Sequence, residues 1–501
     1  MPIDRLILAA ALALAPLAPL AAPLPAQAQD AGPRAFITKG QGTFGTTRMA
    51  YVAAEEEFIL RSPDGKAAAS VFATSYLKAG GKTAKPDASR PVLFVFNGGP
   101  GSASLWLHMG LLGPQRIDFD DPDHPQTTAP FHTVANADSP LDVADLVLID
   151  PPGTGYSRIL ADGTPAMFYG VEQDAVATVQ VMEQWLARHG RMNAPKYILS
   201  ESYGTVRAAV VARLLAGGPT QTGQMDGISL NGVILLGQAM DMAHGAAGDD
   251  RGYLGILPSL AATACHFHKV APGCTPQGQV DAAQAFVDDT YLGALHAGSR
   301  LDPARRAAVA HAMARLVGLP AETILANDLR LSGAAFARLL LASEGRRTGL
   351  YDARFTLPLA AAGPDPVADD PAMAQYVPGF VAAWDAYARD TLKIDLPQPY
   401  KAIAFRDVNG AWDYGSSPSN YATDLATAMN RNPALRVLVG TGLYDLVTPL
   451  GTASDTMAHS GAPADRVAFR TYPAGHMAYL GRDARQALAA DLRAFITGSL
   501  R

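Results

Sequence analysis

Residues 197–205 read YILSESYGT, an apolar run that ends in a short polar turn. Such a run, closed by a glycine and followed by a helical pattern, predicts a buried strand, a tight turn and a helix. Enzymes with a serine nucleophile present it on this kind of unit, usually as G-x-S-x-G. Here Ser200 replaces the first glycine and Glu201 directly precedes Ser202. Ser202 is therefore a candidate nucleophile with an unusual acidic neighbour.

Apolar strands and helical patterns alternate around this unit. Residues 91–101 (PVLFVFNGGPG), 144–150 (ADLVLID) and 231–238 (NGVILLGQ) are typical of buried strands. Residues 169–190 have a helical pattern, with apolar positions at Val176, Val179, Trp185 and Leu186. Buried strands that alternate with helices predict a parallel sheet covered on both faces. The predicted fold class is α/β, with a doubly wound, mostly parallel sheet.

The alternation stops near residue 241 and returns near residue 431. Residues 241–430 are rich in alanine and mostly helical in pattern. Strand patterns then reappear in LRVLVGTGLYD and RVAFRTYPAGH, and the chain ends on a helical pattern. We therefore expect one sheet domain, formed by residues 29–240 and 431–501, with residues 241–430 as a mostly helical insertion.

The N-terminus has the pattern of an export signal. Arg5 precedes the apolar stretch LILAAALALAPLAPLAAPL, and AQAQD follows it. A basic start, an apolar stretch and small residues at an A-x-A site predict a signal peptide over residues 1–28, removed after Ala28. The alternative is a membrane anchor, which the repeated prolines and the cleavage site disfavour. We expect a periplasmic or secreted protein with no stable membrane anchor after cleavage.

Composition excludes two classes of protein. The chain of 501 residues is 49% hydrophobic and 17% charged, which is a globular and not a disordered composition. Its formal net charge is -6 and it has no run rich in Lys and Arg, so we expect no nucleic-acid partner.

The two cysteines, Cys265 and Cys274, lie in the segment CHFHKVAPGC. Export favours a disulfide that closes this short loop. A metal site that also uses His266 and His268 is one alternative, although this spacing fits no familiar zinc pattern. Free, buried thiols are the other alternative. We expect no metal and no cofactor.

Three residues with complementary chemistry each follow an apolar strand, in glycine-bearing turns: Ser202, Asp445 and His476. A serine hydroxyl needs a base within hydrogen-bonding reach, and the base needs an acceptor that fixes its tautomer. The chain order Ser, Asp, His is that of the α/β-hydrolase fold. Catalytic groups in open parallel sheets gather at the carboxyl ends of the strands, where all three are expected.

Residues 96–114, FNGGPGSASLWLHMGLLGP, supply a second candidate element. Two glycines after a buried strand let backbone N–H groups approach a substrate closely. An oxyanion hole needs such donors, aimed at the charge that develops in a tetrahedral intermediate. The N–H of Tyr203, directly after Ser202, is the expected second donor.

The segments NGGPGSAS, LIDPPGTGYS, SESYG, GTGLYD and AGHM resemble the signature blocks of the serine carboxypeptidase family, in that family's order. The resemblance implies a secreted α/β-hydrolase that acts on peptides with a free C-terminus, and it places the family's lid in the 241–430 insertion. It implies the following roles: Ser202 as nucleophile, Asp445 as orienting acid, His476 as base, and Gly99 and Tyr203 as donors of the oxyanion N–H groups.

The resemblance also explains Glu201. In this family the Glu before the serine and the Asn of NGGPG help to bind the substrate's terminal carboxylate, which implies this role for Glu201 and Asn97. The family's second Glu corresponds to Leu111 here, so the carboxyl pair that would keep Glu201 protonated is missing. Arg207 and Arg116 are candidates to supplement the site.

Other residues of these segments have structural interpretations. Asp150 is expected to be a turn residue, and Glu172 and Asp174 are expected to be charges at a helix N-terminus. An esterase, amidase or acyltransferase on the same scaffold is an alternative function that the loss of the second acid favours. A non-catalytic binding protein is a further alternative. The sequence indicates neither the substrate side chain nor the oligomeric state.

Overall fold

The computed structural model describes residues 32–80, 87–217, 228–243, 248–415 and 419–500. The predicted signal peptide, residues 1–28, lies outside these ranges. None of the described helices is long and apolar enough to cross a membrane.

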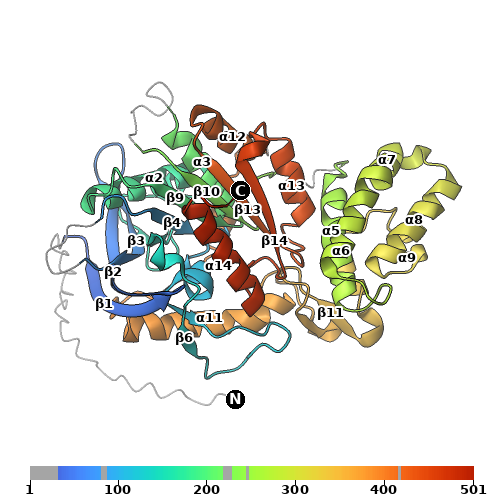
Figure 1. Ribbon diagram of the computed structural model, residues 1–501, viewed down its shortest axis with the longest axis horizontal. Coiled ribbons are helices and arrows are strands. Elements are labelled where there is room, and N and C mark those ends of the chain that lie inside the picture. Colours follow the sequence, from blue (N-terminus) through green and yellow to red (C-terminus); the bar gives the residue numbers. More distant parts are fainter. Residues whose placement is uncertain (1–31, 81–86, 218–227, 244–247, 416–418, 501) are drawn as a thin grey trace, which may run out of the picture.

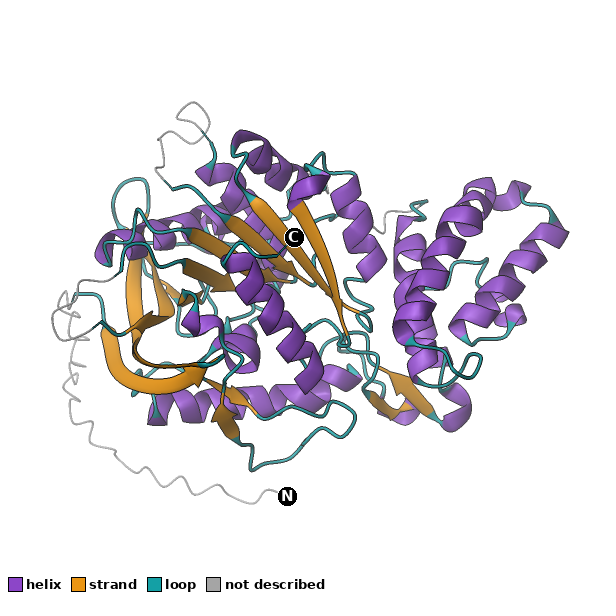
Figure 2. Ribbon diagram, viewed as in Figure 1, coloured by secondary structure: helices purple, strands orange, loops and turns teal. Residues whose placement is uncertain are grey.

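A single large sheet forms the centre of the protein (Figures 1 and 2). Neighbouring strands pair antiparallel from β1 to β7, and all pairs from β7 to β14 are parallel. The predicted fold class is confirmed: this mostly parallel sheet with helices on both faces is the α/β-hydrolase fold. Its spatial order is β1 (Ala35–Phe44), β2 (Thr47–Arg61), β3 (Ala67–Lys78), β7 (Asp145–Ile149), β4 (Val92–Phe96), β9 (Lys196–Glu201), β10 (Gly232–Leu236), β13 (Arg436–Gly442) and β14 (Val467–Tyr472), with β8 (Arg158–Ile159) beside β3.

The strands look apolar throughout because both faces of the sheet are buried. In β4, Leu93 and Val95 face one core, while Val92, Phe94 and Phe96 face the other. Successive side chains of a strand point to opposite faces, so one apolar run supplies two cores.

Helices cover each face of the sheet. On one face lie α1 (Leu105–Leu107), the π-helical turn that continues it (His108–Leu112), α11 (Pro371–Asp390) and α14 (Arg482–Ile496). On the other face lie α2 (Val171–Arg188), α3 (Gly204–Leu215), α12 (Ala422–Arg431) and α13 (Leu450–Ala458).

The helical phase of α2 differs from the prediction at one position. Val176 is 43% exposed, whereas Asp174 in the first turn is buried. Val179, Trp185 and Leu186 are buried as predicted. The face that packs on the sheet thus includes an acidic residue, because Asp174 has a buried partner that the periodicity of apolar residues does not reveal.

The region between β10 and β13 contains two differently packed parts. The first six α-helices among the described residues of this region share their own apolar core, to which Leu443, Tyr444 and Leu446 after β13 also contribute. They form the group at the right of Figure 1. By contrast, α11 and α12 pack on the two faces of the sheet. The six helices are α5 (Arg251–His266), α6 (Pro276–Phe286), α7 (Leu292–Ala297), α8 (Pro303–Val317), α9 (Ala321–Ala326) and α10 (Gly333–Leu339).

Two short hairpins and a disulfide complete the described structure. The hairpins pair β5 (Gln115–Ile117) with β6 (Thr133–Ala135), and β11 (Arg346–Thr348) with β12 (Thr356–Pro358). Cys265, in α5, is joined to Cys274 by a disulfide. The two sulfurs are therefore bonded to each other, which leaves no thiolate for the alternative metal site.

Candidate active site

Ser202 lies in the tight turn between β9 and α3. β9 ends at Glu201, and α3 begins at Gly204. Ser202 has φ 59°, a left-handed conformation that costs a non-glycine residue about 1 kcal/mol or more. Its N–H donates to Leu236 O of β10 over 2.9 Å, which fixes the turn at the carboxyl end of the sheet. The strained turn thus places Ser202 directly after the end of β9, between the strand and α3.

His476 and Asp445 meet at the same edge of the sheet. His476 Nδ1 lies 3.0 Å from Asp445 Oδ2, and both side chains are buried. Asp445 Oδ1 accepts hydrogen bonds from the N–H groups of Val447 and Thr448. The carboxylate is thus held by its own loop, with one oxygen left to orient the imidazole.

Thr448 is a further member of this cluster that sequence reasoning missed. Its hydroxyl donates to Asp445 Oδ2 over 2.5 Å and lies 3.0 Å from His476 Nδ1. The segment DLVT places Thr448 three residues after Asp445, a spacing at which a hydroxyl can reach back to the carboxylate.

The pKa of His476 is raised above its usual value. Burial disfavours the charged imidazole, but the charges of Asp445, Glu201 and Asp370 outweigh burial. The imidazolium that forms when His476 takes a proton is therefore stabilised chiefly by the adjacent Asp445 carboxylate.

The NGGPG loop lies directly against the turn that carries Ser202. A Cβ on Gly98 would lie 2.5 Å from the backbone N of Tyr203, so only glycine allows this approach. Gly99 has φ 107°, a conformation that L side chains rarely adopt. The structure thus brings the backbone of Gly98, directly before Gly99, against the backbone of Tyr203.

One cavity of about 60 Å³ joins the predicted site residues. This volume has room for several water-sized groups. Ser202 and His476 line it together with Asn97, Gly99 and Glu201. Asp445 and Tyr203 contact residues of this lining, Asp445 through His476 and Tyr203 through Gly98. The remaining lining is mostly apolar: Gly98, Ser102, Trp106, Tyr351, Met373, Tyr376, Ile403, Phe405 and Met477.

Glu201 and Asn97 form a hydrogen-bonded pair in the cavity wall. Asn97 Nδ2 donates to Glu201 Oε1 over 2.7 Å, while Asn97 Oδ1 accepts from the N–H of Leu107. Burial raises the pKa of Glu201 to about 7, although nearby His476 and the hydrogen-bonding groups of Tyr479 and Asn97 lower it. A carboxyl group with this pKa is protonated in a large fraction of molecules at neutral pH.

The expectation that Arg207 supplements this site is wrong. Its Nε donates to Asp174 Oδ2 over 2.6 Å, and its Nη1 donates to the backbone O of Asn97 over 2.7 Å. Both side chains of this ion pair are buried. Asp174 is therefore a buried partner and not only a charge at the helix N-terminus, and Arg207 holds the NGGPG loop from behind.

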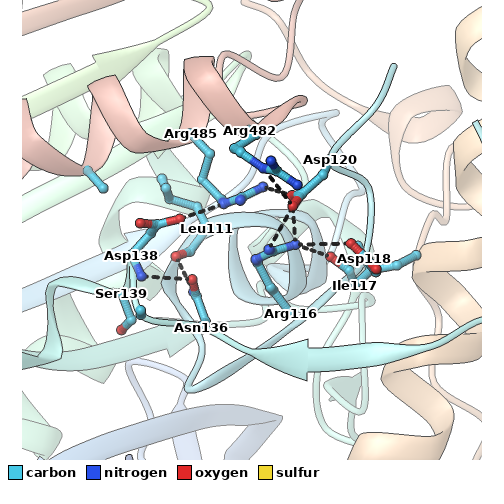
Figure 3. Close-up of polar contacts among 12 residues, drawn as sticks. Leu111, Arg116, Ile117, Asp118, Asp120, Asn136, Asp138, Ser139, Arg482 and Arg485 are labelled. Carbon is cyan, nitrogen blue, oxygen red and sulfur yellow. Dashed lines mark hydrogen bonds and ion pairs between the residues drawn. The ribbon is translucent and has the colours of Figure 1, made fainter. Parts of the chain in front are cut away.

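Arg116 also interacts with residues outside the cavity, as Figure 3 shows. Its Nη1 lies 3.1 Å from Asp120 Oδ1 and donates to the backbone O of Ile117. Asp120 also pairs with Arg482 and Arg485. Among the described residues that line the cavity, none is Lys or Arg.

Asp150 has the structural position expected of it. Its Oδ1 accepts from the N–H of Ser104 over 2.8 Å, which links β7 to the start of α1. Burial raises the pKa of Asp150 to about 6. Asp150 does not line the cavity of Ser202.

Segments between β10 and β13 complete the site. The N–H of His476 donates to Tyr351 O over 2.6 Å, and the ring of Tyr351 meets the imidazole edge-on. The N–H of Ala404 donates to Gly101 O. These residues follow no apolar strand in the sequence, so the pattern of strands and turns could not identify them.

Comparison with known proteins bears on this site. Residues 81–248 match the family model of the serine carboxypeptidases. The resemblance to this family is confirmed. This match and the fold support a hydrolase. No curated protein sequence matches it.

Solved structures with a similar arrangement are more distant. A proline iminopeptidase from Mycobacterium smegmatis is 14% identical, with a TM-score of 0.35 and coverage of 88% of this chain and 98% of that one. An esterase, LipA from Xanthomonas oryzae, is 12% identical, with a TM-score of 0.36 and coverage of 93% and 98%. An epoxide hydrolase variant from Aspergillus niger is 15% identical, with a TM-score of 0.35 and coverage of 89% and 78%. Similarity at this level carries no argument about activity.

Proposed function

We propose that the protein is an exported serine-type carboxypeptidase that hydrolyses the last peptide bond of substrates with a free C-terminus. The observation that carries this proposal is the position of Glu201. This buried carboxyl group, with a pKa raised to about 7, lies beside Ser202 and lines the same cavity as His476. A carboxyl group that keeps its proton can donate a hydrogen bond to a carboxylate.

The first step forms an acyl-enzyme. Ser202 Oγ attacks the last peptide carbonyl while His476 takes the hydroxyl proton, and Asp445 stabilises the imidazolium through Nδ1. The N–H groups of Gly99 and Tyr203 receive the oxyanion. His476 then gives the proton to the leaving amine, so the C–N bond breaks and the C-terminal amino acid departs.

The second step hydrolyses the acyl-enzyme. Water attacks the ester carbonyl, His476 takes a proton from that water, and the same two N–H groups stabilise the second oxyanion. The ester bond breaks, and the proton returns to Ser202 Oγ. The shortened peptide is released with a new free carboxylate.

Neutral hydrogen-bond donors bind the substrate's terminal carboxylate. Because no described Lys or Arg lines the cavity, the protonated carboxyl of Glu201 and the amide of Asn97 are the candidate donors. Their hydrogen bonds are strong where water is excluded, because both groups are buried. A carboxylate fixed at Glu201 places the adjoining peptide bond beside Ser202.

The same cavity also supports a second candidate, an esterase, amidase or acyltransferase. Leu111 is apolar where the resembling family has a second acid, and a cavity whose described lining includes no Lys or Arg suits a neutral substrate. The free and amidated forms of one blocked dipeptide separate the two functions, since equal rates on both would count against carboxylate recognition.

Ser202→Ala tests whether the protein is a serine hydrolase. We expect the wild type to release the C-terminal amino acid from blocked dipeptides and to react with a fluorophosphonate, and the variant to do neither. A wild type that resists the fluorophosphonate and releases no amino acid would instead favour a non-catalytic binding protein.

Export is part of the proposal. Its support is the signal pattern of residues 1–28 together with the Cys265–Cys274 disulfide, since disulfides persist in oxidising compartments. Sequencing the N-terminus of the mature protein tests it. We expect Gln29 as the first residue, and an intact Met1 would contradict cleavage.

A further inference from the structure

Two buried oxygen atoms behind the cavity have no hydrogen-bonding partner among the described residues: Oε2 of Glu201 and the hydroxyl oxygen of Tyr479. Both side chains are at least nine-tenths buried. Tyr479 follows His476 by three residues, in the segment between β14 and α14. A buried polar atom without a partner is costly, so this pair requires an explanation.

The two groups interact with each other. Burial raises the pKa of Glu201, and the Tyr479 hydroxyl lowers it; burial and then the Glu201 carboxylate raise the pKa of Tyr479 well above its usual value. Their contact nevertheless falls outside hydrogen-bond geometry in this structure. A hydrogen bond from the phenol O–H to Oε2 would satisfy both atoms, because a phenol has one donor and a carboxyl oxygen accepts.

The π-helical turn at Gly110 leaves room for the ring of Tyr479. A Cβ on Gly110 would lie 2.4 Å from Cε2 of the Tyr479 ring, so a side chain at position 110 would displace that ring. Gly110 precedes Leu111, the position that corresponds to the second Glu of the resembling family. Tyr479 therefore packs against the turn in which the second acid is missing.

We propose that Tyr479 is the positioning residue for Glu201 and orients its carboxyl group, beside the turn in which the resembling family has a second carboxyl group. This inference rests on the proposed function, in which Glu201 receives the substrate's carboxylate. Tyr479 does not line the cavity and acts through Glu201. Its hydroxyl holds the Glu201 carboxyl group in the orientation in which that group can donate to the substrate's carboxylate in the cavity.

A phenol and a carboxyl group have opposite effects on Glu201. A second carboxylate would raise the pKa of Glu201 by repulsion between like charges, whereas a phenol donor stabilises the charged form. Removing the Tyr479 hydroxyl should therefore raise the pKa of Glu201. The other titratable and polar groups that act on this pair are His476, Asp445, Asn97 and Tyr376.

Tyr479→Phe tests this role in the full-length mature protein. Loss of the orienting hydrogen bond should raise KM for a free-acid dipeptide about threefold to fivefold near pH 6, with kcat within twofold. The pH above which KM rises should move upward by about half a unit, so the ratio of kcat/KM at pH 8 to that at pH 6 should increase about threefold. Kinetics on the amidated dipeptide and the rate of fluorophosphonate labelling should not change.

Tyr472→Phe is the matched control. The Tyr472 hydroxyl donates to a partly buried carboxylate, Asp491 Oδ2, over 2.9 Å, but neither residue lines the cavity. We expect this variant to keep the wild-type pH profile. A Tyr479→Phe enzyme with an unmoved profile, or with equal losses on the acid and the amide, would overturn the inference.

A direct titration separates failure of this inference from failure of the proposed function. The carboxyl of Glu201 can be followed by carbon-13 NMR and assigned with Glu201→Gln. An upward shift of its midpoint in Tyr479→Phe supports the coupling even if the wild type does not prefer free C-termini, in which case the proposed function fails alone. An unchanged midpoint overturns the inference even if the wild type is a carboxypeptidase.

Discussion

Asn97 and Glu201 are 104 residues apart in the chain, and Asn97 Nδ2 donates a hydrogen bond to Glu201 Oε1 over 2.7 Å. Asn97 follows β4 and Glu201 ends β9, two adjacent parallel strands. Parallel strands end at the same edge of a sheet, so the topology itself brings the amide and the carboxyl together beside Ser202.

The pH dependence of substrate binding should follow Glu201. Its pKa is raised to about 7, so its protonated form prevails below pH 7 and disappears above it. We therefore expect KM for a free-acid peptide to rise as the pH increases through about 7. Glu201→Gln has a neutral side chain that donates at every pH, so its KM should stay flat from about pH 5 to pH 9. A KM that rises in this variant as in the wild type would assign the transition to another group.

Replacing Ser202 by glycine should give a more stable protein than replacing it by alanine. Both Ser202→Ala and Ser202→Gly remove the nucleophile, but only alanine keeps a Cβ at φ 59°. We expect the glycine variant to have a free energy of unfolding about 1 kcal/mol higher than the alanine variant, because glycine adopts this conformation without strain. Urea denaturation of both inactive variants measures the difference. Equal stabilities would show that the turn is not strained.

Thr448→Val should reduce kcat without weakening substrate binding. Valine keeps the shape of threonine but loses the hydroxyl that donates to Asp445 Oδ2. Loss of about 1.4 kcal/mol of stabilisation of the Asp445–His476 pair would lower kcat about tenfold. KM should stay within twofold, and Thr448→Ser should restore most of kcat. Full activity of the valine variant would exclude this role.

The Cys265–Cys274 disulfide should stabilise the helices around α5 but not the active site. Closure of a loop of this length contributes about 2–3 kcal/mol in the chain-entropy description. The double variant Cys265→Ser, Cys274→Ser should unfold at lower denaturant concentration. Its kcat at moderate temperature should stay within twofold of wild type, since neither cysteine lines the cavity. A large loss of kcat would mean that these helices shape the site.

The sequence predicted the sheet well because its signals are local. Each of the apolar runs around Phe94, Val147, Ile198 and Ile234 forms a buried strand, and Ser202, Asp445 and His476 follow strands of the sheet. In a parallel sheet, a residue's place directly after a strand already gives its place in space.

The sequence could not predict contacts that depend on tertiary packing. Arg207 is a plausible ligand for a carboxylate until the packing of α2 on α3 places Asp174 against it. Tyr351 reaches the backbone of His476 from a segment without strand or helix patterns of its own. Tyr479 is significant only because Gly110, far away in sequence, leaves room for its ring. Such pairs have no local pattern that a single sequence displays.

The most direct test of the central claim is the ratio of kcat/KM for two blocked dipeptides that differ only in a free or amidated C-terminus, measured near pH 6. Recognition of the terminal carboxylate by Glu201 and Asn97 predicts that the free acid is preferred by about 100-fold or more, since two buried hydrogen bonds to a charged group each contribute about 1.5–3 kcal/mol. It also predicts that Ser202→Ala loses both activities. A ratio near one would contradict a carboxypeptidase and favour an esterase or amidase on the same scaffold.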